Sequence, residues 1–531
     1  MKRLRDRELQ QLGLLSELAY CNPFFLERFT LERQVLGKQF DDEDTSAWSF
    51  RSTLDSGRPV DPRHRPNVVR LATLATDLVE RFLWQVQGGE NFQEKQLSQY
   101  WDVVTYALMY RYFVNVDLDS LFESATTASL WQEFLVDYQR LTNFSAIRKV
   151  QIQAPAHLFS CLCQVRRAFY NIYSFILGES FPSVALRGAV WQSIFTIDLR
   201  RYRRSLFNRM SEFPSLITGP SGTGKELVAR AIGLSQYIPF DEQKLQFAET
   251  SQAHFFPLNL SAMSASLIES ELFGHRKGAF TAAISDRQGW LELCPPHGAI
   301  FLDEIGELDS TLQVKLLRVV QQRTYSRLGE STESRFYGKI IGATNREMDL
   351  EIAAGRFRED LYYRLCADRI QTPSLRQQLD DRPDDLMSLT MALSSRLVGD
   401  RTDEFCDQAM NWIVANLGPT YPWPGNIREL EQCLCSLLIR GVYVPSGSSN
   451  RGDLQPKIPL SASATVAHAM PASFPSWLGK VVGGTLTVEQ LLQHYCAWVY
   501  QQSGSYDSAA KRLKIDRRTV KSRVEANAPL E

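Results

Sequence analysis

Apolar side chains recur at helical spacing through residues 1–182, and patterns typical of strands are rare there. Leu71, Leu74, Leu78 and Phe82 follow one another at intervals of three or four residues, which predicts an amphipathic helix. A second helix is expected over Tyr100–Val114, which is rich in aromatic residues. An aromatic stripe at this spacing is typical of core packing, and a ligand-binding pocket is the alternative. Residues 1–182 are therefore expected to form a helical domain.

From residue 183 onward, short apolar runs alternate with segments of helical spacing. Four of these runs are predicted to be strands: Leu216–Thr218, Phe255–Leu258, Ala299–Leu302 and Lys339–Ala343. Strands that alternate with helices predict a parallel sheet covered by helices, and we assign residues 183–374 to such an α/β domain. Helical spacing returns over residues 375–444, which we expect to form a helical domain.

The C-terminal part of the chain changes in composition twice. Residues 445–484 are rich in Ser, Ala, Pro and Gly, which predicts a flexible linker. Residues 485–531 return to helical spacing and are expected to be an all-α domain. The sequence thus predicts a multidomain protein with an α/β core between helical parts.

Composition is that of an ordinary soluble protein, with 44% apolar and 22% charged residues and a net charge of −1. Nine cysteines lie scattered without a Cys-x-x-Cys pair, so we interpret them as buried thiols in a reducing cytosol, not as zinc ligands. No apolar run reaches membrane-spanning length, and no signal-type apolar core follows Met1. We therefore expect a cytoplasmic protein with no membrane partner.

A glycine-rich loop follows the first predicted strand. It comprises Gly219, Pro220, Ser221, Gly222, Thr223, Gly224, Lys225 and Glu226, and a helix is predicted from Glu226 to Leu234. Glycines allow backbone N–H groups to turn toward phosphate oxygens, the helix directs its positive end at them, and Lys225 adds a charge. The loop therefore predicts a nucleotide phosphate site; a glycine-rich surface turn is the alternative.

Two later strands end in polar residues. Asp303 and Glu304 follow Ala299–Leu302; the first suits Mg²⁺ coordination beside phosphates, and the second can polarise an attacking water. Thr344 and Asn345 follow the strand at Lys339–Ala343 and could sense the terminal phosphate. Taken alone, either pair could be an ordinary solvated strand end. Their order behind a phosphate loop favours a nucleotide-hydrolysing site.

The C-terminus carries a basic pair of predicted helices. Residues 508–513 and 517–526 are separated by the turn Lys514-Ile515-Asp516, which is the spacing of a helix-turn-helix. The residues expected to contact DNA are Lys511, Arg517, Arg518, Thr519, Lys521 and Ser522. A basic helical tail with only a solvated face is the alternative.

These motifs together resemble those of the AAA+ ATPases, and the segments between them resemble one group in particular. Glu269–Ala283, with Gly278-Ala279-Phe280-Thr281-Ala282-Ala283, is similar to the signature of the bacterial enhancer-binding proteins that activate sigma-54 RNA polymerase. The similarity continues through Phe301–Leu308, Gln313–Val319, Gly355–Leu365 and Trp423–Leu430. The family also carries Glu after the loop lysine, as Glu226 does here. The C-terminal helices resemble the Fis-type helix-turn-helix that closes many of these activators.

The resemblance implies ATP and Mg²⁺ as cofactors and a role for each matching residue. Lys225 and its loop would bind phosphates, Asp303 would bind Mg²⁺, and Glu304 would be the catalytic carboxylate paired with Asn259. The first implied sensor is formed by Thr344 and Asn345, and the second is Arg428, in the helical lid at 375–444. Arg358 and Arg364 match the arginine fingers of the family. Phe280 and Thr281 match the residues that contact sigma-54. Fingers that act on a neighbouring subunit require a homo-oligomeric ring, expected to be a hexamer.

The predicted function is therefore an ATP-dependent transcription activator that binds an upstream enhancer site on double-stranded DNA and remodels the sigma-54 polymerase closed complex. Residues 1–182 would be its regulatory or sensory domain, and the protein would work at the bacterial nucleoid. One alternative is a sigma-54-independent, repressor-like AAA+ DNA-binding regulator; another is an AAA+ remodeller of a different substrate. Ala282 stands where the family has glycine, and the lid spacing between Leu375 and Asp384 is longer than usual. The sequence identifies neither the signal nor the target promoters.

Overall fold

The computed structural model describes residues 3–42, 65–114, 116–118, 120–249, 254–280, 283–399, 402–445 and 487–526. The chain divides into two compact units, 1–458 and 459–531, and each is described by itself. The expected linker at 445–484 lies outside the described residues except for Pro445. Among the described residues, no helix combines the length and apolar character needed to cross a membrane.

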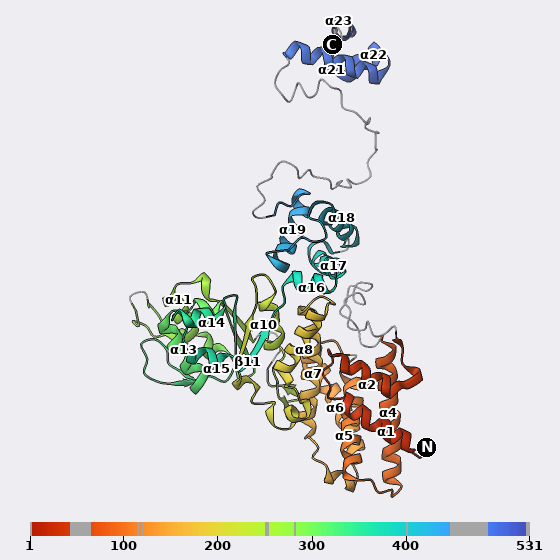
Figure 1. The fold of residues 1–531 in the computed structure, drawn as a ribbon, viewed down its shortest axis with the longest axis vertical. Helices are drawn as coiled ribbons and strands as arrows, with labels where there is room; N and C mark the ends of the chain where they lie inside the picture. The colour runs from red at the N-terminus through yellow and green to blue at the C-terminus, as the bar shows by residue number, and fades with distance from the viewer. Residues whose placement is uncertain are drawn as a thin grey trace. The chain divides into compact units, whose positions relative to one another are not determined.

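The N-terminal part of the first unit is helical, as the sequence predicts. Its helices are α1 (Asp6–Leu18), α2 (Leu26–Leu36), α4 (Pro66–Gln87), α5 (Glu94–Tyr112), α6 (Ser124–Thr142), α7 (Pro155–Phe175) and α8 (Phe181–Phe195). Figure 1 shows α1, α2, α4 and α5 side by side. Their common core is rich in aromatic rings; Phe82 and Tyr100, for example, stack with centroids 4.6 Å apart. The expected aromatic core of α5 is therefore present.

A five-stranded parallel sheet follows, in the order β11-β1-β10-β7-β4. The strands are β1 (Ser215–Thr218), β4 (Phe255–Asn259), β7 (Ala299–Asp303), β10 (Lys339–Thr344) and β11 (Asp368–Gln371). The four predicted strands are confirmed, and β11 is an edge strand that the sequence pattern did not indicate. Its side chains alternate between exposed or half-buried positions and the buried Ile370.

Alternate residues of the strands pack on opposite faces of the sheet. Ile217, Phe301 and Ile341 belong to the core that α7, α8 and α10 (Lys225–Gly233) share. Leu216 and Ile340 belong to the core on the other face, with α11 (Ala265–Phe273), α13 (Ser310–Gln322), α14 (Met348–Ala353) and α15 (Glu359–Leu365). Both faces are covered, which explains why the strands are almost continuously apolar.

Short elements connect these parts. They are α9 (Leu199–Arg201), the π-helix η6 (Tyr202–Leu206), α12 (Trp290–Leu293) and three two-stranded hairpins: β2 (Phe240–Asp241) with β3 (Gln246–Phe247), β5 (Gly274–His275) with β6 (Arg287–Gln288), and β8 (Thr324–Tyr325) with β9 (Ser334–Arg335). The 3-10 turns include η8 (Leu260–Ala262) and η9 (Ile305–Glu307).

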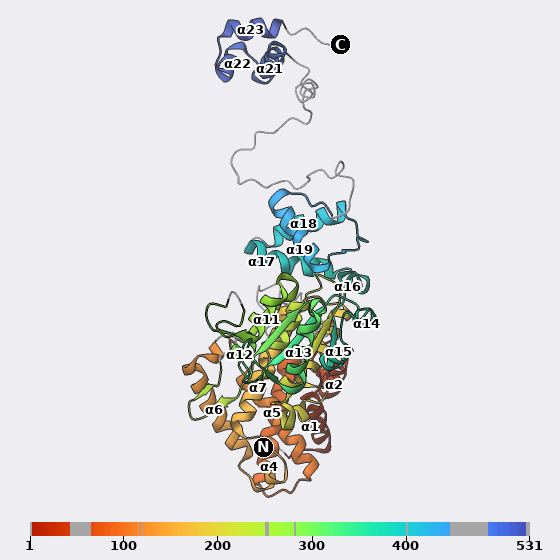
Figure 2. The ribbon, with the colours of Figure 1, turned by 90° about the vertical axis from the view of Figure 1, so that its left-hand side faces the viewer.

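The lid expected after the sheet is helical. It contains α16 (Leu375–Asp381), α17 (Asp385–Val398), α18 (Thr402–Asn416) and α19 (Asn426–Arg440), grouped in Figure 2. These helices pack around a hydrophobic core that contains Trp412, Trp423 and Leu430. The stretch from Leu375 to Asp384, where the long spacing was expected, comprises α16 and the connection Arg382–Asp384 to α17.

The second unit is a three-helix group of α21 (Val488–Ser503), α22 (Tyr506–Leu513) and α23 (Arg517–Glu525). Val499, Ala509 and Val520, one from each helix, form its buried centre. Lys514 takes a left-handed conformation (φ 56°) in the turn between α22 and α23. The two predicted helices and the turn between them are therefore present, and the multidomain fold class is confirmed.

Candidate nucleotide-binding site

The glycine-rich loop connects the end of β1 to the start of α10. Gly222 and Gly224 have φ values of 78° and 85°, a region in which side chains with a Cβ are strained. A Cβ on Gly222 would also lie 2.2 Å from the carbonyl oxygen of Gly425 in the lid. Glycine is therefore required at this position both for the backbone angle and for the approach of the lid.

The loop presents donors that suit an anion. Within the described part of the chain, no residue accepts a hydrogen bond from the backbone N–H groups of Gly222, Thr223 and Gly224. Lys225 is 7% exposed, and its Nζ donates to the carbonyl oxygens of Gly219 (3.0 Å) and Pro220 (3.1 Å). Backbone donors at a helix N-terminus beside a lysine fit the phosphates of a nucleotide.

Burial lowers the pKa of the Lys225 ammonium, and the nearby Glu304 and Asp303 carboxylates partly offset this effect. The lysine therefore lies in electrostatic contact with the two acidic residues at the end of β7. Glu226, the next residue, lies 3.8 Å from Arg230 on the exposed side of α10. Its carboxylate is thus directed along the helix surface.

The acidic pair stands at the carboxyl end of β7, beside the ends of β4 and β10. In the sheet register Asp303 pairs with Asn259 of β4. Glu304 leaves the strand in a left-handed conformation (φ 55°, ψ 47°), and its N–H donates to Asp303 Oδ1 at 3.1 Å. Left-handed backbone angles are uncommon for residues other than glycine and cluster at functional sites.

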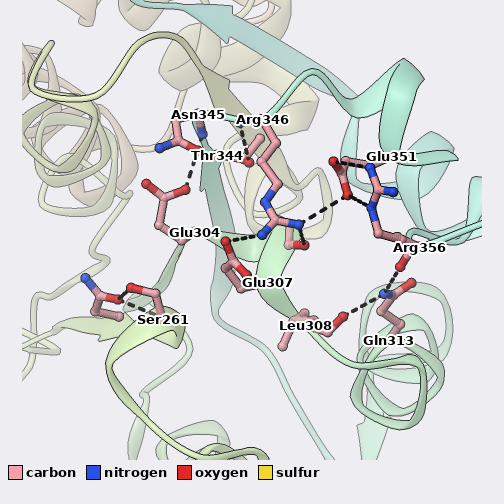
Figure 3. Close-up of polar contacts among 12 residues, drawn as sticks. Ser261, Glu304, Glu307, Leu308, Gln313, Thr344, Asn345, Arg346, Glu351 and Arg356 are labelled. Carbon is pink, nitrogen blue, oxygen red and sulfur yellow. Dashed lines mark hydrogen bonds and ion pairs between the residues drawn. The ribbon is translucent and has the colours of Figure 1, made fainter. Parts of the chain in front are cut away.

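Glu304 contacts the residue expected to act as a sensor on the next strand. The backbone N–H of Asn345 donates to Glu304 Oε2 at 3.3 Å (Figure 3). Thr344 is fully buried, and its Oγ1 accepts a hydrogen bond from the N–H of Arg346 at 3.1 Å. The structure thus brings the candidate catalytic carboxylate and the candidate sensor strand together.

Asn259 makes a different contact from the one the resemblance implies. Its Oδ1 accepts hydrogen bonds from the N–H of Ser261 (3.0 Å) and the hydroxyl of Ser261 (2.8 Å). Over the described ranges, no hydrogen bond joins Asn259 to Glu304. The two residues stand on neighbouring strands, and their pairing stays a prediction.

The donor set fits a magnesium ion that is held mainly by a nucleotide. The described residues contain no group of three or more His, Cys, Asp or Glu side chains able to hold a metal by themselves. Mg²⁺ characteristically binds one or two protein carboxylates together with phosphate oxygens and water. Asp303, which is half-buried at the strand end, suits that role.

The lid contacts the phosphate loop through the first turn of helix α19. Arg428 Nη1 donates to the Ser221 hydroxyl at 3.1 Å, and the Arg428 N–H donates to the Gly222 carbonyl at 3.3 Å. Asn426 Nδ2 donates to the Ser221 carbonyl at 2.9 Å, while Asn426 Oδ1 accepts from the N–H of Leu375. Asn426 thus connects the phosphate loop to the starts of α16 and α19. The sequence analysis did not identify this residue. Its place after a glycine at a helix start was the available signal.

Thr372, at the end of β11, is a second residue that was overlooked. Its hydroxyl lies 2.7 Å from the Thr223 hydroxyl, and a Cβ on Gly219 would meet it at 2.1 Å. Thr372 is 1% exposed, so it contacts the phosphate loop from the buried side.

A charged network extends from the sensor strand to Arg356, two residues before the first candidate arginine finger (Figure 3). Arg346 pairs with Glu307 and, at 3.2 Å, with Glu351. Glu351 accepts two hydrogen bonds from Arg356, at 2.7 Å and 2.8 Å. These guanidinium donors lower the pKa of Glu351 to about 2. Glu351 therefore stays ionised and holds α14 against the residues that precede the finger.

Gln313 of α13 completes the connection to Arg358. It is 1% exposed; its Nε2 donates to the carbonyls of Leu308 (2.8 Å) and Arg356 (2.9 Å), and its Oε1 accepts from the Arg358 N–H (2.8 Å). The Arg358 side chain is exposed and pairs with Asp360 at 2.6 Å. The backbone of Arg358 is thus fixed while its guanidinium remains on the surface.

Arg364 is exposed in the last turn of α15, the helix that Arg358 precedes as its N-cap residue. It lines a groove of about 680 Å³ together with Phe213, Arg323 and Tyr337. Both candidate fingers therefore lie on the surface of the first unit, where a neighbouring subunit could be reached.

The candidate sigma-54 contact loop projects from the β5–β6 hairpin. Phe280 is 42% exposed, and its ring meets that of His275 edge-on at 4.9 Å. The Gly278 N–H donates to the Ala283 carbonyl at 2.9 Å, which closes the loop at its base. Thr281 and Ala282 lie outside the described residues.

In the second unit, the basic residues expected to meet DNA lie mainly on the surface. Lys511, Arg517, Arg518, Lys521 and Ser522 are exposed, and Thr519 is half-buried. Asp516 caps α23 by accepting a hydrogen bond from the Arg518 N–H at 2.7 Å. Arg517 pairs with Asp507 at 3.3 Å, which joins the two helices of the motif.

Residues 199–371 match the family profile described as the sigma-54 interaction domain. This part of the chain is thus similar to a sigma-54 interaction domain. This domain includes the phosphate loop, both acidic residues, the Phe280 loop and the two candidate fingers; Asn426 and Arg428 lie beyond its end.

Two curated relatives are similar to part of this chain. The chain is 43% identical over 219 residues to the Nif-specific regulatory protein of Enterobacter agglomerans, a match that covers 41% of this chain and 38% of that protein. It is 37% identical over 317 residues to the transcriptional regulatory protein ZraR of Escherichia coli K12, covering 58% of this chain and 62% of ZraR. The chain therefore spans less than two thirds of the length of these relatives.

Among solved structures, NtrX from Brucella abortus in complex with ADP is similar to 76% of this chain and 85% of its own, with a TM-score of 0.40 and 20% identity. A similarity this low supports no argument about function.

Proposed function

We propose that this protein is an ATP-driven transcription activator that remodels a closed complex of sigma-54 RNA polymerase. The observation that carries the proposal is the combination, in one sigma-54 interaction domain, of a phosphate loop, a Glu304–Asn345 contact beside it, and the exposed aromatic Phe280. The relatives named as regulatory proteins support the same function. Exposed aromatic residues on a projecting loop often mark a partner contact.

For hydrolysis, each residue of the site has a task that its position allows. The loop N–H groups and Lys225 bind the phosphates, while Arg428 and Asn426 connect the lid to the bound loop. Asp303 would hold Mg²⁺, which supplies positive charge to the phosphates when bound. Glu304 orients and polarises the attacking water, and Thr344 and Asn345 fix the strand beside it.

We infer that the protein works as a homo-oligomeric ring, with six subunits as the expected number. Arg358 and Arg364 are exposed, and a finger that acts on the nucleotide of a neighbour needs a closed arrangement of subunits. The network of Arg346, Glu351 and Gln313 would position the first finger in response to the sensor strand.

The proposed function also assigns a role to the other domains of the chain. The helix-turn-helix in the second unit would bind an upstream enhancer site on double-stranded DNA, using the exposed residues of α23. Residues 1–182 would regulate the ATPase at 183–374 and the lid at 375–444, with 445–484 as the linker. Such an activator would act in the bacterial cytoplasm, at the nucleoid.

A reconstituted promoter tests this function. Purified protein, sigma-54 holoenzyme and a template with an upstream site should form open complexes with ATP but not with a non-hydrolysable analogue. Lys225→Ala serves as the matched control and should form none. If the protein hydrolyses ATP and binds DNA but no open complex forms, the sigma-54-independent regulator becomes the better account.

A further inference from the structure

A second cavity, of about 120 Å³, lies where the N-terminal helices α1, α5 and α7 meet α8, α9 and η6. Its apolar wall includes Tyr106, Met109, Tyr110, Phe169 and Trp191. The rings of Tyr106 and Tyr110 lie 4.6 Å apart. Part of the aromatic stripe of α5 thus lines a cavity, in addition to packing in the core.

The charged residues that line this cavity are all of one sign. Arg28, Arg65, Arg166 and Arg203 contribute to its wall, and no carboxylate does among the residues that the structure describes. Arg28 has a partner in Glu32, at 2.6 Å. A wall of aromatic rings and guanidinium groups is chemically suited to an apolar anion.

Arg203 is the least compensated of these charges. It is 3% exposed, its Nη2 donates to the neutral side chains of Gln153 (2.8 Å) and Thr105 (3.4 Å), and its Nε has no partner within the described ranges. Arg200, three residues earlier, instead pairs with Asp102 at 2.9 Å. A buried guanidinium without an anion is unfavourable, so a ligand carboxylate would be bound strongly at this point.

The size of the cavity limits the ligand to one ring. An engineered cavity of roughly 150 Å³ with an apolar lining is known to hold benzene. We propose that this cavity binds a small aromatic carboxylate, with its ring against Tyr106, Phe169 and Trp191 and its carboxylate on the guanidinium of Arg203.

The cavity lies in contact with the sigma-54 interaction domain. Arg203 belongs to the π-helix η6, which lies inside that domain and precedes β1; π-helical turns are frequent at functional sites. Helix α7, whose Leu162 and Val165 line the cavity, packs on α10, the helix that begins with Lys225. Ligand binding would therefore change the packing behind the phosphate loop, and this regulatory step rests on the proposed ATPase function.

Calorimetric titration of the full chain with benzoate tests the site without nucleotide. One benzoate should bind per chain, and benzamide, which has the same shape without the charge, should bind about tenfold more weakly or worse. Arg203→Gln should weaken benzoate binding by about tenfold or more and leave benzamide binding within about twofold. The matched control is Arg204→Gln, which removes an exposed arginine of the same π-helix and should change neither affinity.

Val165→Phe provides an independent variant, because it fills the cavity and leaves every arginine in place. It should weaken benzoate and benzamide alike. Absence of saturable benzoate binding at millimolar concentrations by the parent would overturn the proposal, and so would parental affinity in both Arg203→Gln and Val165→Phe. If Arg203→Gln does not fold, parental affinity in Val165→Phe alone is decisive.

The regulatory step has its own readout. Saturating benzoate should change the ATPase rate of the parent by about twofold or more and leave that of Arg203→Gln unchanged. Benzoate binding without a change in rate would overturn the coupling, and a parent that hydrolyses no ATP would overturn the proposed function while the titration still decides the site.

Discussion

The backbone N–H of Asn345 donates to Oε2 of Glu304 at 3.3 Å, across the ends of two neighbouring strands (Figure 3). Glu304 has left-handed backbone angles, and its carboxylate accepts this hydrogen bond from the residue that follows β10. The Glu304 carboxylate thus lies beside the phosphate loop and accepts a hydrogen bond from an uncharged donor, the Asn345 N–H. A carboxylate placed in this way can polarise water without being neutralised by an ion pair.

Replacement of Glu304 by Gln should separate binding from hydrolysis. The amide keeps the shape of the side chain but loses the charge that polarises water, so ATP should bind with parental affinity while turnover falls by about a hundredfold or more. Fluorescent-nucleotide binding and steady-state ATPase assays measure the two effects. Glu347→Gln, at an exposed residue near the same strand end, is the control and should behave as the parent. Parental turnover in Glu304→Gln would show that another group activates the water.

The candidate fingers should act between subunits. Arg358 lies on the surface with its backbone fixed by Gln313, so Arg358→Ala should leave each subunit folded but nearly inactive. Mixed with Lys225→Ala protein, it should recover part of the parental ATPase rate, since some junctions then combine an intact finger with an intact loop. Native mass spectrometry confirms that mixed rings form. Mixed rings without any recovered activity would contradict action in trans.

The second unit should supply DNA binding independently of the ATPase. Arg517 and Arg518 are exposed at the start of α23, where side chains of a recognition helix reach base edges. Changing both to Ala should weaken specific binding by about a hundredfold, with the ATPase rate unchanged. Gel-shift titration at physiological salt measures the effect, and Arg440→Ala, which removes one exposed arginine from the lid, is the control. Operator binding at parental affinity would remove the helix-turn-helix from the account.

Lys339 should make stability depend on pH. It is fully buried at the start of β10, where burial lowers its pKa to about 8, and its Nζ donates to the Phe213 carbonyl at 2.9 Å. The unfolded chain has a lysine pKa near 10.4, so the folded state carries an unfavourable buried charge below about pH 8 and loses it as the pH rises toward 10.

Comparison with Lys339→Met isolates this effect from other titrating groups. The stability of the parent relative to the variant should increase by on the order of 2 kcal/mol between pH 7 and pH 10. Thermal unfolding of both proteins at the two pH values measures it as a change in the difference between their midpoints. A difference in midpoint that does not vary with pH would show that Lys339 keeps the pKa of a solvated lysine in the folded state.

Much of the fold could be predicted because its signals are local. The four central strands are short apolar runs, the phosphate loop has its own glycine spacing, and Asp303 and Glu304 follow a strand directly. The edge strand β11 could not be predicted in this way, because Ile370 is its only buried apolar residue. Its place in the sheet is set by pairing with β1, which residue spacing does not encode.

The residues overlooked at the site act across long distances in sequence. Asn426 contacts Ser221, 205 residues earlier, and Thr372 contacts Thr223, 149 residues earlier. Asparagine and threonine are common in loops, so the local sequence does not show which distant residue each one contacts. The cavity beside Arg203 is assembled from helices spread over the first two hundred residues, and its charge imbalance is visible only when those helices are packed. The Asn259–Glu304 pair and the loop residues Thr281 and Ala282 stay predictions.

The loop at Phe280 should uncouple hydrolysis from activation when it is changed. Thr281→Ala should abolish open-complex formation while the ATPase rate stays near that of the parent, because the loop contacts the partner and not the nucleotide. Ala282→Gly restores easy access to positive φ and should leave activation similar or higher. Open-complex assays on a sigma-54 promoter measure both. Full activation by Thr281→Ala would show that the contact lies elsewhere.

The most direct test of the account is the binding of purified sigma-54 to the full chain in the presence of a transition-state analogue of ATP hydrolysis. Analytical gel filtration should show a stable complex with the analogue, no complex with ADP, and no complex when Phe280 is replaced by Ala. A ring that hydrolyses ATP normally but forms no complex with sigma-54 in any nucleotide state would contradict the account.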